Sequence, residues 1–276
     1  MIYHYTSINT LALILESRKI RFNRLDRVDD MRESQTAAGI EFGKYFFVSC
    51  WTKSAKEHVP LWHMYTPKMK GVRIGLPDMP FQMMPLNAPP AWNTQQRGEI
   101  LSLLSFEEMF RDTYCILPVF LTPDMFAGPV SYVPDIADSY RNNVELIVGS
   151  DNHGNLIIKN MPLLPRTKDD YWAFQDEYRF VLLIVPSIPV PPTGVGSPEF
   201  VGEFPSHVLS SFIQGADPGI EYYDLTLSQD ALNSIEVTLG PRTDRSDRLV
   251  VEALLEKFTS SGKVSNSALA IRSAKR

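Results

Sequence analysis

The sequence predicts a single α+β domain, and three features of the chain support this prediction. Hydrophobic residues make up 44% of the 276 residues, which is enough to form a sizeable core. Strand-like and helix-like segments alternate irregularly and are separated by long proline-rich connections, unlike the regular alternation of a doubly wound parallel sheet. No internal repeat divides the chain. We therefore expect one elaborated domain over residues 1–258 and a polar tail over residues 259–276.

Four elements are expected in the first third of the chain. Residues 7–20 carry apolar side chains at helical spacing, and Ser7 can cap the first turn, so this segment predicts a helix. The segments 43–52 and 72–76 are rich in aromatic or β-branched residues, which favours strands. Residues 59–68 lie between them and predict a short helix or a turn.

The middle of the chain begins with a proline-rich stretch. Residues 77–98 contain five prolines, and each fixes φ and removes a backbone donor, so we expect an irregular excursion over the surface. Helical periodicity returns at residues 100–112, and residues 115–121 predict a strand that a proline interrupts. Residues 138–148 are compatible with either a helix or a strand.

The last third contains the most hydrophobic strand of the sequence. Residues 178–185 are mostly apolar, which is typical of a buried central strand. Residues 186–206 are again rich in proline and glycine, residues 234–240 predict a late strand, and residues 247–258 predict an amphipathic helix. We expect residues 259–276 to be solvated.

Charge and cysteine content narrow the function classes. A net charge of −5 argues against a nonspecific nucleic-acid binder, because such proteins hold phosphates with an excess of Lys and Arg, although it leaves room for a local basic channel. The two cysteines, Cys50 and Cys115, suit a reducing compartment, so we expect a cytoplasmic protein. The chain shows no signal-peptide pattern and no run of about 18 apolar residues, so no membrane partner is expected.

Several common site motifs are missing from the sequence. There is no GxGxxG, GxxxxGK[ST] or GxSxG pattern, which argues against a Rossmann, P-loop or serine-hydrolase site. The five histidines lack metal-ligand spacing and the two cysteines lie far apart, so we expect no metal site.

The first candidate constellation is the opening segment, in which Tyr3, His4, Tyr5 and Thr6 precede the expected helix. A histidine at such a junction can donate to a sugar hydroxyl, and Thr6 with nearby backbone N–H groups can bind an adenine or phosphate edge. The structural alternative is a histidine satisfied by the backbone.

The second constellation is aromatic and comprises Trp51, Trp62 and Tyr65. If residues 62–65 form a helical turn, Trp62 and Tyr65 share a face and can form a wall for a planar ring. The alternative, above all for Trp62, is an ordinary aromatic core cluster.

The third constellation is a carboxylate, Glu177, at the start of the most apolar strand. Charge at such a place is costly unless it is paired or functional. Glu177 and Arg179 are two residues apart, so they share a face once the strand has begun. A structural ion pair between them is the alternative to a catalytic role.

Five segments together resemble a known family: YHYTSINTLALILESRKIRF, FVSCWT, LWHMYTPKMKGVRIGL, WAFQDEYRF and SIEVTLGPR. In this order, from Tyr3 to about Arg272, they resemble the bacterial family called domain of unknown function 2971. The opening also resembles that of ADP-ribosyltransferase-fold proteins, in which an H-Y-T-type strand leads into a helix. This resemblance implies a split, strongly bent pair of β-sheets with flanking helices, which grips NAD in the cleft between its halves.

The resemblance also implies roles for three residues. His4 would hydrogen-bond the NAD ribose, Tyr65 would stack on nicotinamide, and Glu177 would hold a ribose hydroxyl on a later strand. Tyr5 and Thr6 would adjoin the cofactor beside His4. The sequence leaves open two further points: Trp51 or Trp62 could supply the stacking surface, and Arg21 or Arg73 could bind the pyrophosphate.

The expected function is an NAD-dependent ADP-ribosyltransferase that modifies a macromolecule, either RNA, DNA or protein, as a toxin-like or phage-defence effector. The Pro-rich stretches 77–98 and 186–206 are candidate substrate loops, with Trp92 available for base stacking. An antitoxin or chaperone is a further expected kind of partner. The alternatives are an NAD glycohydrolase, in which water is the acceptor, and an inactive nucleotide-binding or sensing module.

Overall fold

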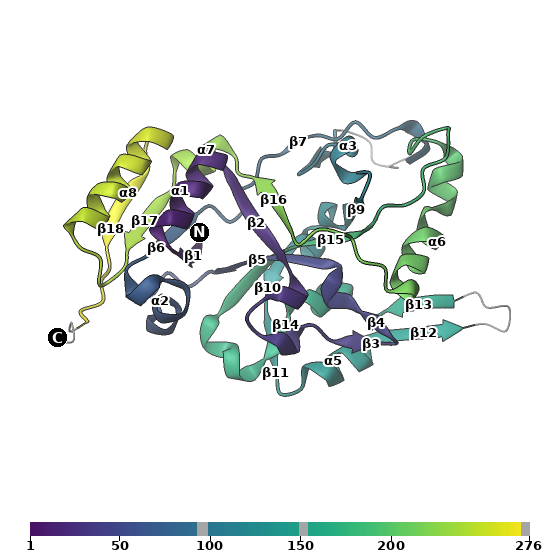
Figure 1. The fold of residues 1–276 in the computed structure, drawn as a ribbon, viewed down its shortest axis with the longest axis horizontal. Helices are drawn as coiled ribbons and strands as arrows, with labels where there is room; N and C mark the ends of the chain where they lie inside the picture. The colour runs from purple at the N-terminus through teal and green to yellow at the C-terminus, as the bar shows by residue number, and fades with distance from the viewer. Residues whose placement is uncertain (93–98, 149–153, 272–276) are drawn as a thin grey trace.

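A computed structural model describes residues 1–92, 99–148 and 154–271 of the protein (Figure 1). Its main feature is a ten-stranded sheet in which the order β10-β15-β5-β1-β6-β17-β18 forms the central path. Strand β9 also pairs with β15, and β2 joins β5 to β16. The strands are β1 (Ile2–Thr6), β2 (Lys19–Arg24), β5 (Phe46–Thr52), β6 (Val72–Leu76), β9 (Tyr114–Leu117), β10 (Ala127–Pro129), β15 (Glu177–Pro186), β16 (Tyr222–Thr226), β17 (Glu236–Leu239) and β18 (Lys263–Asn266).

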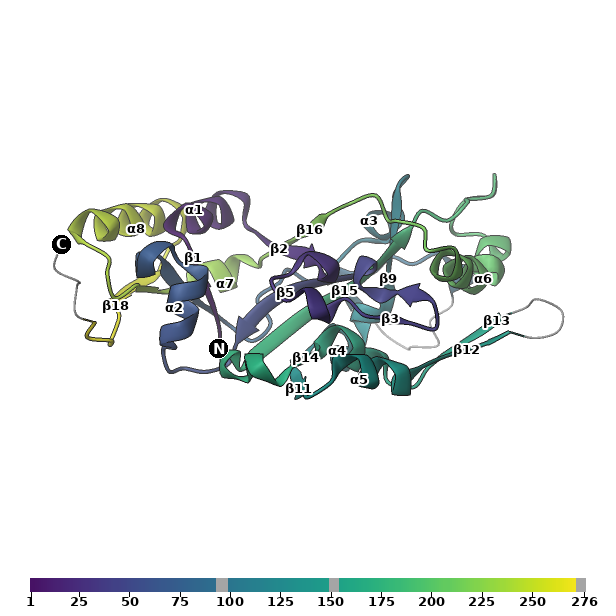
Figure 2. The same ribbon diagram turned by 60° about the horizontal axis from the view of Figure 1, so that its bottom comes forward.

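Neighbouring strands of this sheet are antiparallel, except for the parallel pair β17 and β18. Four two-stranded ribbons accompany it: β3 (Thr36–Ala37) with β4 (Ile40–Glu41), β7 (Met84–Pro85) with β8 (Leu101–Ser102), β11 (Ser131–Val133) with β14 (Thr167–Asp169), and β12 (Val144–Val148) with β13 (Gly154–Ile158). The ribbon of β12 and β13 extends away from the body in both views (Figures 1 and 2).

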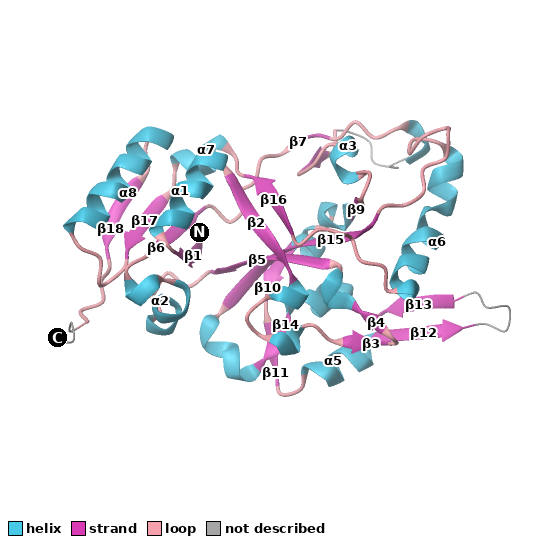
Figure 3. Cartoon of the chain, viewed as in Figure 1, coloured by secondary structure: helices cyan, strands magenta, loops and turns pink. Residues whose placement is uncertain are grey.

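Helices lie at both ends of the sheet (Figure 3). Helices α1 and α8 contact one another beside β17 and β18, and α6 lies at the opposite end (Figures 1 and 2). The helices are α1 (Ile8–Ser17), α2 (Val59–Tyr65), α3 (Phe106–Met109), α4 (Pro123–Phe126), α5 (Ile136–Asn143), α6 (Pro198–Gln214), α7 (Gln229–Asn233) and α8 (Arg245–Phe258). None of them has the length and apolar character needed to cross a membrane.

The sheet divides at β5. One edge of β5 pairs with β15 along the whole run from Phe46 to Thr52. The other edge is shared, because β2 pairs at Phe47 and Val48 whereas β1 pairs only at Thr52. Between these points β1 and β2 leave β5 in different directions, and no strand of the described residues pairs with residues 49–51 on that edge.

The alternation of β15 explains how the core is built. Phe180, Leu182 and Ile184 belong to one buried cluster, and the intervening Val181 and Leu183 belong to a second cluster on the opposite face. Both faces of β15 are therefore covered, which confirms the expected buried central strand and the α+β class. Burial of these side chains supplies about 2 kcal/mol each.

Several other predicted elements are confirmed. The helix predicted at residues 7–20 is present as α1, and the Ser7 hydroxyl oxygen accepts from the Thr10 N–H at 3.0 Å. It ends at Ser17, however, and Ile20 lies in β2, where the side chains alternate between buried and exposed. The strands β5, β6 and β17 and the helices α2 and α8 lie within or close to their predicted ranges.

The prediction of a helix at residues 100–112 is wrong for most of this range. Only the single turn α3 is helical, because its capping box at Ser105 starts it late and Phe110 adopts an extended conformation. The apolar spacing reflects burial of an irregular segment, since Leu103, Leu104 and Met109 all lie in the core. The ambiguous residues 138–148 contain the end of α5 and then β12.

Two proline-rich or polar segments are more ordered than expected. Residues 186–206 are not irregular throughout, because α6 begins at Pro198, where the missing N–H costs nothing, and Ser197 caps it. Residues 259–276 are not simply a solvated tail, because β18 pairs with β17 and extends the sheet. Residues 93–98 of the predicted excursion, and residues 272–276 of the tail, lie outside the described residues.

Candidate functional site

A pocket of about 280 Å³ opens where β1 and β2 separate at β5. Its walls come from β1, β2, β5, α2 and β15, and from the segment that follows β2. Of the residues predicted from the sequence, six line it: His4, Tyr5, Arg21, Trp51, Tyr65 and Glu177. Thr6 and Arg73 do not line it.

His4 bridges the opening in the sheet. Its Nδ1 lies 2.9 Å from the Cys50 carbonyl oxygen, and because a carbonyl only accepts, Nδ1 carries the proton. Burial lowers the pKa of His4, while the Cys50 hydrogen bond partly opposes that shift. The imidazole is thus neutral at pH 7 and Nε2 is an acceptor. A ribose hydroxyl would donate to it, which reverses the expectation that His4 donates.

The three candidate aromatic residues differ in access. Trp62 is fully buried and its Nε1 donates to Glu57 at 3.0 Å. Trp51 is 3% exposed, and its ring lies beside His4 with centroids 5.2 Å apart. Tyr65, at the end of α2, is 36% exposed. Of these three residues, Tyr65 is therefore the ring that a ligand can reach, and the Trp51 ring packs against His4.

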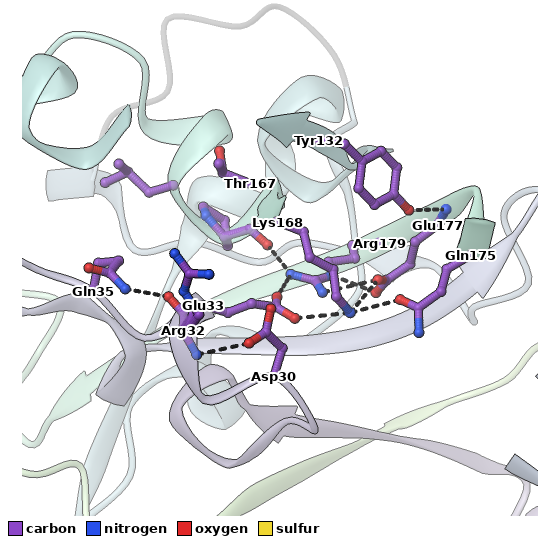
Figure 4. Close-up of polar contacts among 12 residues, drawn as sticks. Asp30, Arg32, Glu33, Gln35, Tyr132, Thr167, Lys168, Gln175, Glu177 and Arg179 are labelled. Carbon is purple, nitrogen blue, oxygen red and sulfur yellow. Dashed lines mark hydrogen bonds and ion pairs between the residues drawn. The ribbon is translucent and has the colours of Figure 1, made fainter. Parts of the chain in front are cut away.

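Glu177 lies in a buried cluster of four charges (Figure 4). Its Oε1 accepts from Arg179 Nε at 2.6 Å, and its Oε2 accepts from Lys168 Nζ at 3.3 Å. The second carboxylate is Glu33, whose oxygens pair with Lys168 at 3.0 Å and with Arg179 at 2.5 Å. The Glu–Arg pair that the strand spacing allowed is therefore present.

The two cations keep Glu177 ionised. Burial by itself would raise the pKa of this carboxyl, but Arg179 and Lys168 outweigh it and lower the pKa to about 2. Its Oε2 also accepts from Arg179 Nη2 at 3.1 Å, and the Cys50 thiol donates to the same carboxylate. With Arg179 Nε and Lys168 Nζ, these four donors match the four acceptor positions of the two oxygens, so a ligand hydroxyl would bind Glu177 in place of one of them, and the Cys50 thiol also lines the pocket.

Lys168 contacts both carboxylates of the cluster, and all three of its N–H donors are used within the described residues. Its three N–H groups meet three acceptors: Gln175 Oε1 at 2.8 Å, Glu33 and Glu177. Gln175 in turn donates from Nε2 to the Tyr65 hydroxyl at 2.8 Å. A continuous chain of polar contacts thus joins the carboxylate on β15 to the accessible ring on α2.

Local backbone geometry brings Gln175 and Glu177 together. The 3₁₀ helix Asp170–Gln175 ends at Asp176, which has φ of 43° and ψ of 54°. This left-handed conformation, uncommon for residues other than glycine, turns the chain so that β15 begins directly at Glu177. The backbone N–H of Glu177 then donates to the Tyr132 hydroxyl at 2.9 Å (Figure 4).

The other predicted contacts are further from the centre. Arg21 lines the pocket at its exposed side, pairs with Asp224 at 2.9 Å and lies over the Tyr222 ring. Arg73 is buried, and its guanidinium donates to the Ala55 carbonyl and covers the Tyr3 ring. Of the two predicted arginines, only Arg21 therefore lines the pocket, and it does so with its guanidinium held by Asp224.

Sequence reasoning missed part of the site. Glu33 is fully buried in the 3₁₀ helix Met31–Glu33, and Asp29 lines the pocket just before it. The sequence of this segment, RVDDMRESQ, carries no apolar periodicity and no motif. Adjacent Arg32 pairs with Asp169 at 2.6 Å, which fastens the same segment to β14.

Comparison of the chain with protein-family models, curated proteins and solved structures finds no match.

Proposed function

We propose that this chain is an NAD-dependent ADP-ribosyltransferase that transfers to a macromolecular acceptor. The observation that supports the proposal is the convergence of His4, Tyr65 and Glu177 on one pocket, although they lie on three separate elements. The pocket holds about 280 Å³, enough for a nucleoside-sized group, and Arg21 stands at its exposed side for the adjoining phosphates.

The chemistry follows from the charges of the pocket. Cleavage of the bond between nicotinamide and ribose develops positive charge on the sugar, and the ionised Glu177 lies where it would stabilise that charge. A ribose hydroxyl would donate to this carboxylate in place of the Cys50 thiol, and a second hydroxyl would donate to His4 Nε2. The Tyr65 ring would hold nicotinamide by stacking. The acceptor nucleophile then bonds to the sugar carbon that nicotinamide leaves.

A nucleotide-binding module without turnover is the second candidate. The ion pairs of Glu177 with Arg179 and Lys168 favour this candidate. The two cations offset the negative charge with which a catalytic carboxylate would stabilise the positively charged sugar. An NAD glycohydrolase would use the same contacts, with water in place of the macromolecule.

The test uses NAD labelled on its adenylate part, with whole-cell extract as the source of acceptors. Wild-type protein is compared with Glu177→Gln and Tyr65→Ala, and Tyr171→Ala is the matched control, because Tyr171 is 81% exposed. We expect full label in a macromolecule from wild type and the control, about 10-fold less from Tyr65→Ala and none from Glu177→Gln, and digestion by RNase, DNase or protease names the class of the acceptor. Free ADP-ribose alone indicates the glycohydrolase. Binding of NAD without its consumption indicates the module, and no binding refutes all three.

A further inference from the structure

We infer that Asp29 is the specificity-determining residue of this pocket and that it recognises the carboxamide N–H₂ group of a nicotinamide ring stacked on Tyr65. This inference rests on the proposed function and adds the chemical feature of NAD that the site selects. The observation behind it is the placement of a second, exposed carboxylate in the same pocket as Glu177.

Asp29 lies between two short 3₁₀ helices, Leu25–Arg27 and Met31–Glu33. Both ends of this segment are fixed: the Arg24 guanidinium pairs with Asp26 at 2.6 Å, and Glu33 is held in the buried charge cluster. The carboxylate of Asp29 is therefore presented to the pocket from an anchored loop.

The arginines near Asp29 all pair elsewhere. Arg24 contacts Asp26 and Asp217, Arg27 contacts Glu221, and Arg32 contacts Asp169. Among the described residues no ion pair involves Asp29. Glu177 is paired with two cations, so the two carboxylates of the pocket differ: Glu177 is buried, whereas Asp29 is exposed and accepts from the Tyr65 hydroxyl, which leaves further acceptor positions for a ligand.

Asp29 also lies at the edge of the accessible ring. Burial raises the pKa of Tyr65, and the next largest cause is the negative charge of Asp29 beside its hydroxyl. The same hydroxyl accepts from Gln175 at 2.8 Å. A ring stacked on Tyr65 would thus bring a substituent at its own edge toward the Asp29 carboxylate.

The chemistry of that substituent decides the fit. A carboxamide has two N–H donors that a carboxylate accepts, whereas a ring carboxylate would face Asp29 with like charge. Two unit charges about 4 Å apart at a partly solvated site repel enough to change affinity by about 10-fold or more. The pocket is therefore built to accept NAD and to reject nicotinic acid adenine dinucleotide, its analogue with a carboxylate.

The experiment measures binding of these two dinucleotides by calorimetry, without any acceptor. We expect wild type to bind NAD at least about 10-fold more tightly than the nicotinic acid analogue. In Asp29→Asn the preference falls to about threefold or less, because the Asn amide can donate to the ring carboxylate. Asp112→Asn, an exposed aspartate at the second pocket, retains the wild-type preference.

Three results overturn the inference. Equal affinity of wild type for the two dinucleotides shows that the pocket does not read the carboxamide. A preference that persists in Asp29→Asn assigns the selection to another group. If wild type binds neither dinucleotide, the proposed function fails together with the inference, whereas the first two results leave NAD binding intact and refute the inference alone.

Discussion

His4 Nδ1 donates a hydrogen bond to the Cys50 carbonyl oxygen at 2.9 Å, across the place where β1 and β2 leave β5. The imidazole supplies a hydrogen-bond partner to a β5 carbonyl on an edge where the described part of the chain places no paired strand. One side chain therefore closes the sheet and faces the pocket. The proposed ribose contact and the local stability of the sheet are coupled through this residue.

The first prediction concerns His4→Ala. Removal of the ring leaves the Cys50 carbonyl without this donor, so we expect the free energy of unfolding to fall by about 1–2 kcal/mol in urea titrations. NAD affinity, measured by calorimetry, falls about 10-fold because Nε2 is lost. His63→Ala is the control, since His63 is exposed on α2. Unchanged NAD affinity in His4→Ala would remove His4 from the site.

The second prediction separates the ring of Tyr65 from its hydroxyl. If stacking is its role, Tyr65→Phe keeps most of the rate of nicotinamide release, whereas Tyr65→Ala loses about 10-fold. Thermal unfolding of both variants shows whether they remain folded. A loss in Tyr65→Phe as large as that in Tyr65→Ala would show that the hydroxyl and its Gln175 contact carry the effect.

The third prediction concerns Glu33→Gln. The substitution leaves Lys168 and Arg179 with a single buried carboxylate, so we expect a loss of about 3–5 kcal/mol in the free energy of unfolding. Glu16→Gln on the exposed face of α1 changes stability by less than about 0.5 kcal/mol. Similar values for both variants would mean that the four-charge cluster does not stabilise the fold.

The fourth prediction is a pH dependence of stability. The pKa of Glu177 is about 2 in the folded protein, below the ordinary value of 4.5. As the pH falls, the unfolded chain therefore takes up this proton before the folded protein does. The stabilisation is complete above about pH 5 and is lost as the pH falls toward about 2, with a total of about 3 kcal/mol. Burial also lowers the pKa of His4. The unfolded state therefore binds this proton at a higher pH than the folded state, so His4 contributes a further loss of stability as the pH falls below about 6.5.

Urea titrations of wild type and Glu177→Gln between pH 7 and pH 3 test this dependence. The variant has lower stability at pH 7 and a flatter profile below pH 5, because the titrating carboxyl is absent. Parallel profiles for the two proteins would contradict the assignment of the low pKa to Glu177.

The fifth prediction concerns the C-terminal segment. Leu269 and Ile271 contact the cluster that contains Trp62, and the backbone N–H of Ala268 donates to Glu57. A chain that ends at Phe258 loses these contacts and β18, so we expect its melting temperature to fall by several degrees. A chain that ends at Ile271 is the control. Equal melting temperatures would show that the segment contributes nothing to stability.

Elements with local signals follow from residue type and spacing along the chain. Ser7 caps α1 through a hydroxyl contact three residues away, and the apolar run 178–185 produces a strand buried on both faces. The pairing of Glu177 with Arg179 also follows from strand alternation. These features depend on neighbours in the chain, so period and residue type are sufficient to predict them.

The assembly of the site depends on contacts between segments that are distant in the sequence. Tyr65 meets Gln175 across 110 residues, and Glu33 and Asp29 reach the pocket from a segment without a sequence signal. The helix expected at residues 100–112 failed because burial, and not helical periodicity, set its apolar spacing. Such contacts depend on strand register and on the division of the sheet at β5, which arise from packing between distant segments and not from local conformational preference.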